Sequence, residues 1–145
     1  AKVQAEQQAA IRRFSGAGTV VANSKCGGGY PFCNYPADVT AYAGGFQALG
    51  NTRECVNYVQ WRIFQLTGRN ELHGNAGSWM GVANSGAQVN TVAIIGYGRL
   101  PYGHVAWVEE VRGGSVLISE YNWNPYNYTE RWVSASSFDG FYNPL

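Results

Sequence analysis

The residue of this chain best suited to nucleophilic chemistry is Cys55, which follows a helix-start signal at Asn51 and Thr52. In the first turn of a helix, unsatisfied backbone N–H groups and the positive end of the helix dipole favour a thiolate, the nucleophilic form of cysteine. The alternative interpretation is a buried structural cysteine, because cysteine also packs as a small hydrophobic residue. A catalytic role requires a base elsewhere in the chain.

The chain offers two histidines as that base. His104 opens the apolar stretch GHVAWV, and a base at the first residue of a strand is rigidly mounted yet still reaches the surface. His73 lies in the polar segment NELHGN and is interpreted as an exposed structural histidine. We therefore expect His104 to be the base for Cys55.

The strand predicted to pair with the histidine strand would supply an acceptor that orients the imidazole. If residues 112–114 form a three-residue loop, His104 lies opposite Asn122 and diagonal to Glu120, and all three side chains share one face. A two-residue turn at 113–114 would place Glu120 and Asn122 on the other face. The alternative for Glu120 is an ordinary surface glutamate. The same face would carry apolar residues suited to packing on the helix that presents Cys55, namely Ala106, Val108, Val116 and Ile118.

Elements that would position these residues are visible in the hydrophobic pattern. Apolar residues at helical spacing before Gly68 predict a helix over residues 52–67, and a shorter helix is predicted over 78–84. From Val89 onward, β-branched and aromatic residues predict a run of antiparallel strands. Residues 15–50 indicate an irregular arm with short extended pieces. The fold class expected is therefore α+β, with N-terminal helices packed on a central antiparallel β-sheet.

Composition narrows the choice of function. Hydrophobic residues make up 46% of the chain and charged residues 13%, which argues against a disordered or coiled-coil chain. The formal net charge of +1 gives no signal for nucleic acid or an acidic membrane surface. No apolar run is long enough for a membrane span.

The N-terminal residues 1–14 differ from the rest of the chain. They are rich in Ala and Gln, favour a helix and have almost no apolar face, so they are interpreted as a polar helical tail, the end of an upstream helical or coiled-coil region. No signal-peptide pattern opens the sequence, which is either a mature chain or a piece of a longer protein. Because of the polar helical start we interpret it as a piece, with residues 15–145 as the catalytic domain. We expect a regulatory contact of that domain with the upstream coiled coil or with a divisome protein.

Cys26 and Cys33 flank a Gly-rich segment that a disulfide would close easily, which implies an oxidising compartment. The alternative is two unrelated thiols in a cytosolic protein. A zinc site is disfavoured because four ligands are needed and no histidine lies nearby.

Taken together, the motifs resemble those of the CHAP family, the cysteine- and histidine-dependent amidohydrolases/peptidases, over roughly residues 45–144. The resemblance is carried in order by RECVNYVQWR, GNAGSW, YGHVAWVEEV and ISEYNW. It implies a papain-like CHAP fold with Cys55 as nucleophile, His104 as base, Glu120 as orienting acid and Asn122 as a polar helper. It also implies a secreted, cell-wall-associated enzyme without metal or organic cofactor that cuts an amide bond of bacterial peptidoglycan, either as an N-acetylmuramoyl-L-alanine amidase or as a stem or cross-bridge endopeptidase.

Two departures from the family pattern concern the surroundings of the site. Many family members have Gln before the nucleophile, whereas this chain has Glu54, which cannot donate to an oxyanion while it is ionised. The segment NTVAII replaces a Pro-x-x-Gly-Ala turn that often precedes the histidine strand.

Several aromatic residues could line a groove for an extended polymer, and Trp123 and Tyr126 are the candidates for substrate binding because they follow the acid strand directly. Packing in the core or on the surface is the alternative. Two other functions remain open: a non-catalytic wall-binding or scaffolding module, and an intracellular amidase with Cys26 and Cys33 reduced. Reaction of Cys55 with iodoacetamide well below the usual thiol pKa would favour an enzyme over a binding module.

Overall fold

The computed structural model describes residues 2–14 and 17–145. The elements in chain order are α1 (Lys2–Arg12), β1 (Thr19–Ser24), β2 (Ala41–Ala43), β3 (Phe46–Ala48), α2 (Cys55–Thr67), the 3-10 helix η1 (Ala76–Val82), β4 (Val92–Ile95), β5 (His104–Arg112), β6 (Ser115–Tyr121), β7 (Tyr128–Ser134), the 3-10 helix η2 (Ala135–Ser137) and β8 (Gly140–Tyr142).

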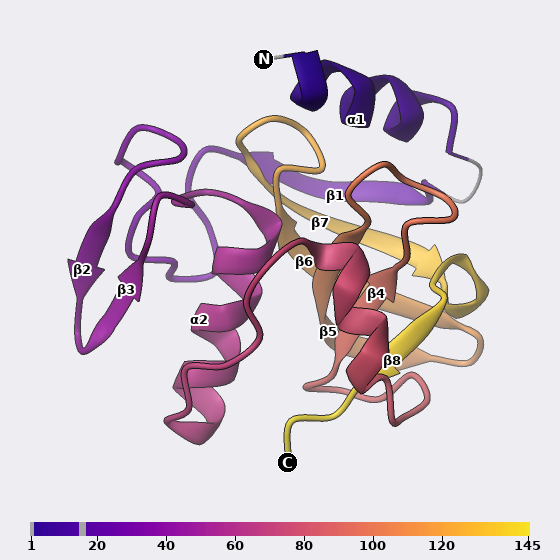
Figure 1. Ribbon diagram of the computed structural model, residues 1–145. Coiled ribbons are helices and arrows are strands. Elements are labelled where there is room, and N and C mark those ends of the chain that lie inside the picture. The colour runs from indigo at the N-terminus through magenta and orange to yellow at the C-terminus, as the bar shows by residue number, and fades with distance from the viewer. Residues whose placement is uncertain (1, 15–16) are drawn as a thin grey trace.

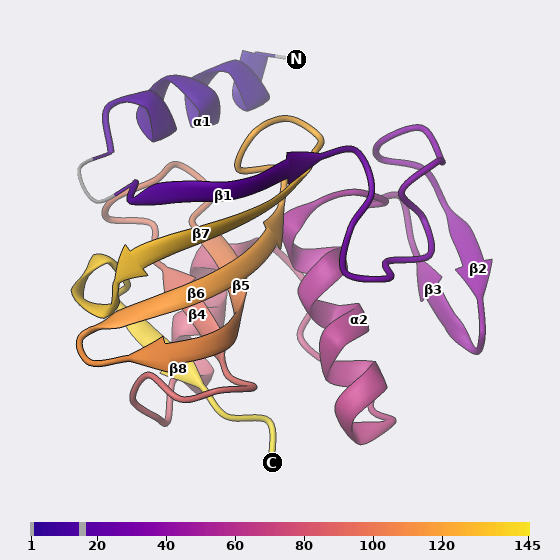
Figure 2. The same cartoon turned by 180° about the vertical axis from the view of Figure 1, so that it is seen from behind.

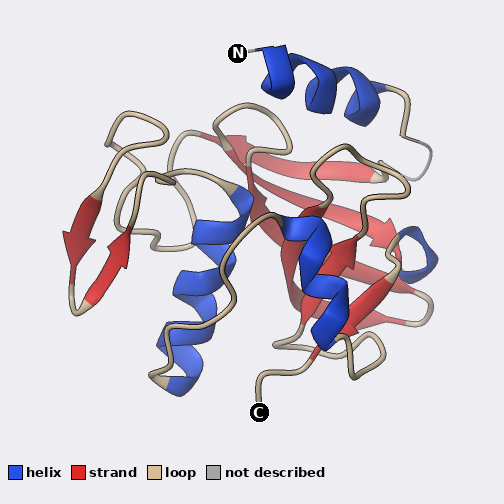
Figure 3. Cartoon of the chain, viewed as in Figure 1, coloured by secondary structure: helices blue, strands red, loops and turns tan. Residues whose placement is uncertain are grey.

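A six-stranded antiparallel sheet in the order β1-β7-β6-β5-β4-β8 forms the centre of the molecule, and β2 and β3 form a separate hairpin (Figures 1 and 2). In Figure 3, η1 lies in front of the sheet, α2 lies to the left and α1 lies above. The α+β class predicted from the sequence is confirmed, and the arrangement is consistent with a papain-like CHAP fold.

Helix α2 begins at Cys55, three residues later than the predicted start. Glu54 is the N-cap residue, in an extended conformation and without a side-chain capping bond. Thr52 instead donates its hydroxyl to the carbonyl of Pro36. The helix ends as predicted at Gly68, whose φ of 76° lets its N–H reach the carbonyl of Phe64. This geometry places Cys55 at the very first turn.

Two other predicted segments differ from the structure. The short helix predicted over 78–84 is the 3-10 helix η1, which begins at Ala76. The predicted irregular arm contains β1, which pairs with β7 at the edge of the sheet. Most side chains of β1 are exposed, so the strand has no alternation of buried and exposed residues that could have revealed it in the sequence.

The hairpin of β5 and β6 has a two-residue turn, because Arg112 pairs with Ser115. The expected three-residue loop is therefore wrong. A β-bulge lies between Val108 and Glu110, however, and on its far side Trp107 pairs with Ser119. The extra residue in β5 shifts the register by one. His104 and Glu120 therefore share one face of the sheet, although a two-residue turn without the bulge would have placed them on opposite faces.

The core has two parts, one on each face of the sheet. Helix α2 packs through Tyr58, Val59 and Ile63 on the face that carries Val105 and Trp107. The four residues predicted to pack on this helix lie instead in the second cluster, with Ile11 of α1 and Phe138: Ala106, Val108, Val116 and Ile118. That packing prediction is wrong, because these four residues face the side of the sheet opposite to α2.

Cys26 and Cys33 form a disulfide with a Cα–Cα distance of 5.1 Å, as predicted. The proposed domain boundary between residues 14 and 15 falls at the edge of a gap in the described residues, since 15 and 16 lie outside them. Helix α1 contacts the rest of the chain and buries Ile11. None of the helices that the structure describes has the length and apolar character needed to cross a membrane.

Candidate active site

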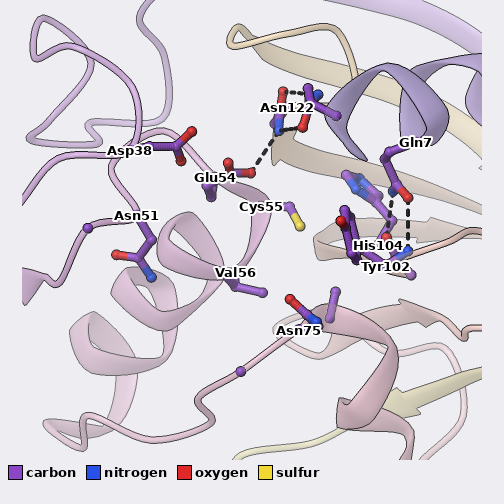
Figure 4. A pocket seen from close by; sticks show the side chains of 15 residues that line it. Gln7, Asp38, Asn51, Glu54, Cys55, Val56, Asn75, Tyr102, His104 and Asn122 are labelled. Carbon is purple, nitrogen blue, oxygen red and sulfur yellow. Dashed lines mark hydrogen bonds between the residues drawn. The ribbon is translucent and has the colours of Figure 1, made fainter. Parts of the chain in front are cut away.

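Cys55 and His104 line one cavity of about 360 Å³. Cys55 comes from the first residue of α2 and His104 from the first residue of β5. Figure 4 shows the sulfur of Cys55 directed into the cavity, with His104 and Asn75 on the far side of the space. The structure thus brings together the two residues that the sequence predicted as nucleophile and base.

His104 is held in place from its backbone and from its ring. Its backbone pairs with Ile95 of β4, and the preceding Gly103 has a φ of 70° that favours glycine. The side chain is 1% exposed, and its Nε2 lies 2.8 Å from Oε1 of Glu120. The predicted contact of histidine with a carboxylate on the paired strand is therefore present, and it fixes the orientation of the ring.

Glu120 is fully buried and ionised. Thr129 donates to its Oε2 at 2.6 Å, and the guanidinium of Arg131 donates to Oε2 at 2.6 Å and to Oε1 at 2.9 Å. Burial by itself would raise the pKa of Glu120, but the charge of Arg131 and the bonds from His104 and Arg131 outweigh it and lower the pKa to about 2. The carboxylate next to the imidazole is therefore an anion at any physiological pH.

Arg131 supports the site but was not predicted from the sequence. Its side chain is 1% exposed, its guanidinium also donates to the carbonyl of Ala17, and its central carbon lies 3.8 Å from the ring centroid of Trp123. A signal was present in the sequence, because Thr129, Arg131 and Val133 alternate along β7 and Val133 points into the core. A charged residue at such an inward position needs a buried partner of opposite charge.

The surroundings of the Cys55 thiol favour its protonated form. Burial and then the neighbouring Glu54 raise the pKa of Cys55 to about 12, although hydrogen bonds from the backbone N–H groups of Val105 and Val56 act in the opposite direction. The expectation that the helix start would favour a thiolate is therefore corrected, since desolvation and nearby carboxylates outweigh the helix terminus. Cys55 is the free cysteine of the chain, and the residue as a whole is partly exposed whereas its thiol is buried.

Asn122 lies at the cavity but bonds to Glu54 and not to His104: its Nδ2 donates to Oε1 of Glu54 at 2.7 Å. Burial, followed by the bond and charge of the nearby Asp38, raises the pKa of Glu54 to about 8. The raised pKa favours the protonated form of the Glu54 carboxyl at neutral pH, and a protonated carboxyl can donate a hydrogen bond.

Trp123 and Tyr126 are not among the described residues that line the cavity. Trp123 is 8% exposed and its ring centroid lies 5.1 Å from that of His104. Tyr126 donates its hydroxyl to Asp38 at 3.3 Å. Contact of either ring with substrate stays a prediction.

Across residues 2–14 and 17–145, no three His, Cys, Asp or Glu side chains are grouped so as to hold a metal ion.

The architecture and the position of the cysteine at a helix start are of the papain-like kind, and comparison with known proteins gives the family. The model of the CHAP domain matches residues 42–122, more than half of the 145-residue chain. The chain belongs to the CHAP domain family. A curated relative from Staphylococcus aureus (strain NCTC 8325 / PS 47), described as the probable autolysin SsaALP, is 35% identical over 130 residues. The alignment covers 83% of this chain and 49% of the relative, so the chain spans about half of that protein's length. No solved structure matches the chain significantly.

Proposed function

We propose that this chain is a cysteine-dependent hydrolase that cleaves an amide bond of bacterial peptidoglycan, secreted and acting at the cell wall. The observation that carries the proposal is the presence of Cys55 and His104 in the wall of one cavity, where the histidine is oriented by the ionised Glu120. Family membership and the description of the relative as an autolysin support the wall as the site of action. The disulfide between Cys26 and Cys33 fits an oxidising compartment.

In the proposed reaction, His104 removes the proton from the Cys55 thiol as the sulfur attacks the amide carbonyl. Because Nε2 of His104 is engaged with Glu120, the other ring nitrogen, Nδ1, is assigned the proton transfer. The raised pKa of Cys55 makes this transfer necessary, since few thiolates exist before the base acts. The anionic Glu120 stabilises the imidazolium that forms.

Collapse of the tetrahedral intermediate breaks the C–N bond, and the imidazolium gives its proton to the leaving amine. Water, deprotonated by His104, then attacks the thioester and releases the acid and the free thiol. Backbone N–H groups at the start of α2 have no partner within the helix and are proposed to bind the oxyanion, together with the neutral Glu54.

A digest of purified peptidoglycan tests this proposal. We expect soluble fragments with the intact chain and none with Cys55→Ala, as judged by mass spectrometry. A new muramic acid end without its peptide would indicate an amidase, whereas new peptide termini would indicate an endopeptidase. Fragments that persist with Cys55→Ala would contradict a cysteine mechanism.

A non-catalytic wall-binding module is the second candidate, favoured by the raised pKa of the Cys55 thiol. Such a module would bind insoluble peptidoglycan without releasing fragments, and His104→Ala would bind equally well.

Regulation by an upstream coiled-coil region or by a divisome protein stays a prediction. Helix α1 contributes Gln4 and Gln7 to the cavity wall, so a segment joined to α1 would lie beside the site. Equal activity of this chain and of a longer form that includes such a region would contradict the prediction.

A further inference from the structure

Gln7 of α1 joins the N-terminal helix to the turn that precedes the candidate base. Its Nε2 donates to the carbonyl of Gly103 at 2.7 Å, and its Oε1 accepts from the N–H of Tyr102 at 3.0 Å. A backbone N–H can only donate and a carbonyl can only accept, so both bonds require the same orientation of the amide. The side chain is 6% exposed, although it belongs to a helix that looked polar in sequence. Figure 4 shows this pair of bonds next to His104.

The Tyr102–Gly103 turn is bonded to Gln7 on one side and packs closely against η1 on the other. The N–H of Gly77 in η1 donates to the carbonyl of Tyr102 at 2.8 Å. A Cβ at Gly103 would lie only 2.4 Å from the nitrogen of Gly77, so the two backbones are in close contact. The turn is thus clamped between η1 and Gln7, and His104 is the next residue along the chain.

Polar contacts carry much of the docking of α1. Among the side chains of α1 that the structure describes, Ile11 is the buried apolar one. Gln4 forms long amide bonds of 3.4 Å with Asn122. Helix α1 therefore touches both neighbours of the site, the Tyr102–Gly103 turn and Asn122. It does so from outside residues 42–122, the segment that the CHAP model matches.

We propose that Gln7 is a positioning residue for the hydrolase, holding the Tyr102–Gly103 turn so that His104 stays aligned with Cys55. The predicted fall in kcat rests on the proposed function, whereas the predicted ordering of the turn by Gln7 does not. Without the amide, the N–H of Tyr102 and the carbonyl of Gly103 lose their partners, and the turn is free to relax away from η1. A displacement of the base by an ångström is enough to slow a reaction that depends on alignment.

The test compares Gln7→Met with Glu6→Ala in the full chain. Methionine keeps the length of the side chain and removes both bonds, whereas Glu6 is an exposed neighbour on the same helix. For Gln7→Met we expect faster hydrogen exchange at the Tyr102 amide, and a kcat on soluble peptidoglycan fragments lower by roughly tenfold to a hundredfold with KM nearly unchanged. Glu6→Ala should leave exchange and kinetics as in the unaltered chain.

Two measurements separate the outcomes. If the unaltered chain cleaves no peptidoglycan, the proposed function fails, yet the Tyr102 exchange rate and the NMR titration of His104 still report whether Gln7 orders the turn. Exchange at the Tyr102 amide that is as slow in Gln7→Met as in the unaltered chain would overturn the inference. So would a fall in kcat that the unfolded fraction of Gln7→Met fully explains. If Gln7→Met does not fold, Gln7→Glu replaces it, because a carboxylate still accepts from Tyr102 but cannot donate to Gly103. Gln7→Glu should lower kcat and change the NMR titration of His104, and the same kcat and titration as in the unaltered chain would overturn the inference.

Discussion

Arg131 and Glu120 form a buried ion pair in which Nε of the arginine lies 2.6 Å from Oε2 of the glutamate and the two side chains are 1% and 0% exposed. A buried carboxylate without this partner would neutralise or be solvated, and its support for His104 would weaken. Arg131 therefore acts on the candidate base through Glu120, without touching the cavity itself.

Removal of the Arg131 guanidinium should destabilise the fold. We expect Arg131→Met to lower the free energy of unfolding by about 3–5 kcal/mol, because it leaves the Glu120 charge unpaired in the interior. The double variant Glu120→Gln/Arg131→Met should recover part of the loss, since it buries no charge. Urea unfolding followed by fluorescence measures both.

A matched control for that experiment is Arg112→Met, which removes an exposed ion pair with Glu110. Its stability should stay close to that of the unaltered chain, because exposed pairs contribute little. Equal stability of Arg131→Met and Arg112→Met would show that the buried pair does not support the fold.

The stability of the fold at acid pH should depend on the Glu120 carboxylate. The pKa of Glu120 is lowered from 4.5 to about 2, so its contribution is fully present above the unfolded value and is lost as the pH falls through the folded one. The shift corresponds to a stabilisation on the order of 3 kcal/mol. Unfolding free energies measured from pH 6 down to pH 2 should fall less steeply for Glu120→Gln than for the unaltered chain, and parallel curves would contradict this origin.

Reactivity of Cys55 should depend on His104. Because burial raises the pKa of the Cys55 thiol, its reaction with iodoacetamide at pH 7 needs a base, so His104→Ala should react slowly there and faster only toward strongly alkaline pH. In the unaltered chain we expect reaction at neutral pH, since His104 can remove the thiol proton as the sulfur attacks the reagent. The disulfide at Cys26 and Cys33 confines labelling to Cys55 under non-reducing conditions. Identical pH profiles for the two proteins would exclude His104 as the base.

The alkaline limit of activity should come from Glu54. Its pKa is raised to about 8, so above that pH the carboxyl ionises, loses its donor proton and places a negative charge beside Cys55. Glu54→Gln should match the unaltered chain at pH 7 and keep its kcat/KM above pH 8, where that of the unaltered chain declines.

Asp38→Asn provides the matched comparison. Removal of the Asp38 charge lowers the pKa of Glu54, so the decline in kcat/KM should begin at lower pH than in the unaltered chain. Coincident profiles of Glu54→Gln and the unaltered chain from pH 6 to pH 10 would assign the alkaline limit to another group.

The hairpin shows how far local sequence could predict the site. The common face of His104 and Glu120 was inferred from a three-residue loop, yet the turn has two residues and a bulge near Glu109 restores the register. In the structure, Glu109 accepts hydrogen bonds from Arg62 of α2 and from Ser119. A bulge held by partners from other elements leaves no pattern in the strand that contains it.

The order of the residues and their chemistry were determined by the sequence alone. The helix-start cysteine, the strand-start histidine, the α+β class and the disulfide all follow from periodicity, turn residues and spacing, which are local properties of the chain. The charge states of the site residues, and the contacts that hold these residues in place, were decided only by the tertiary structure. Burial depends on what packs around a group, so the raised pKa values of Cys55 and Glu54, the pairing of Arg131 with Glu120 and the clamp of Gln7 on the turn before His104 arise from contacts between residues distant in sequence.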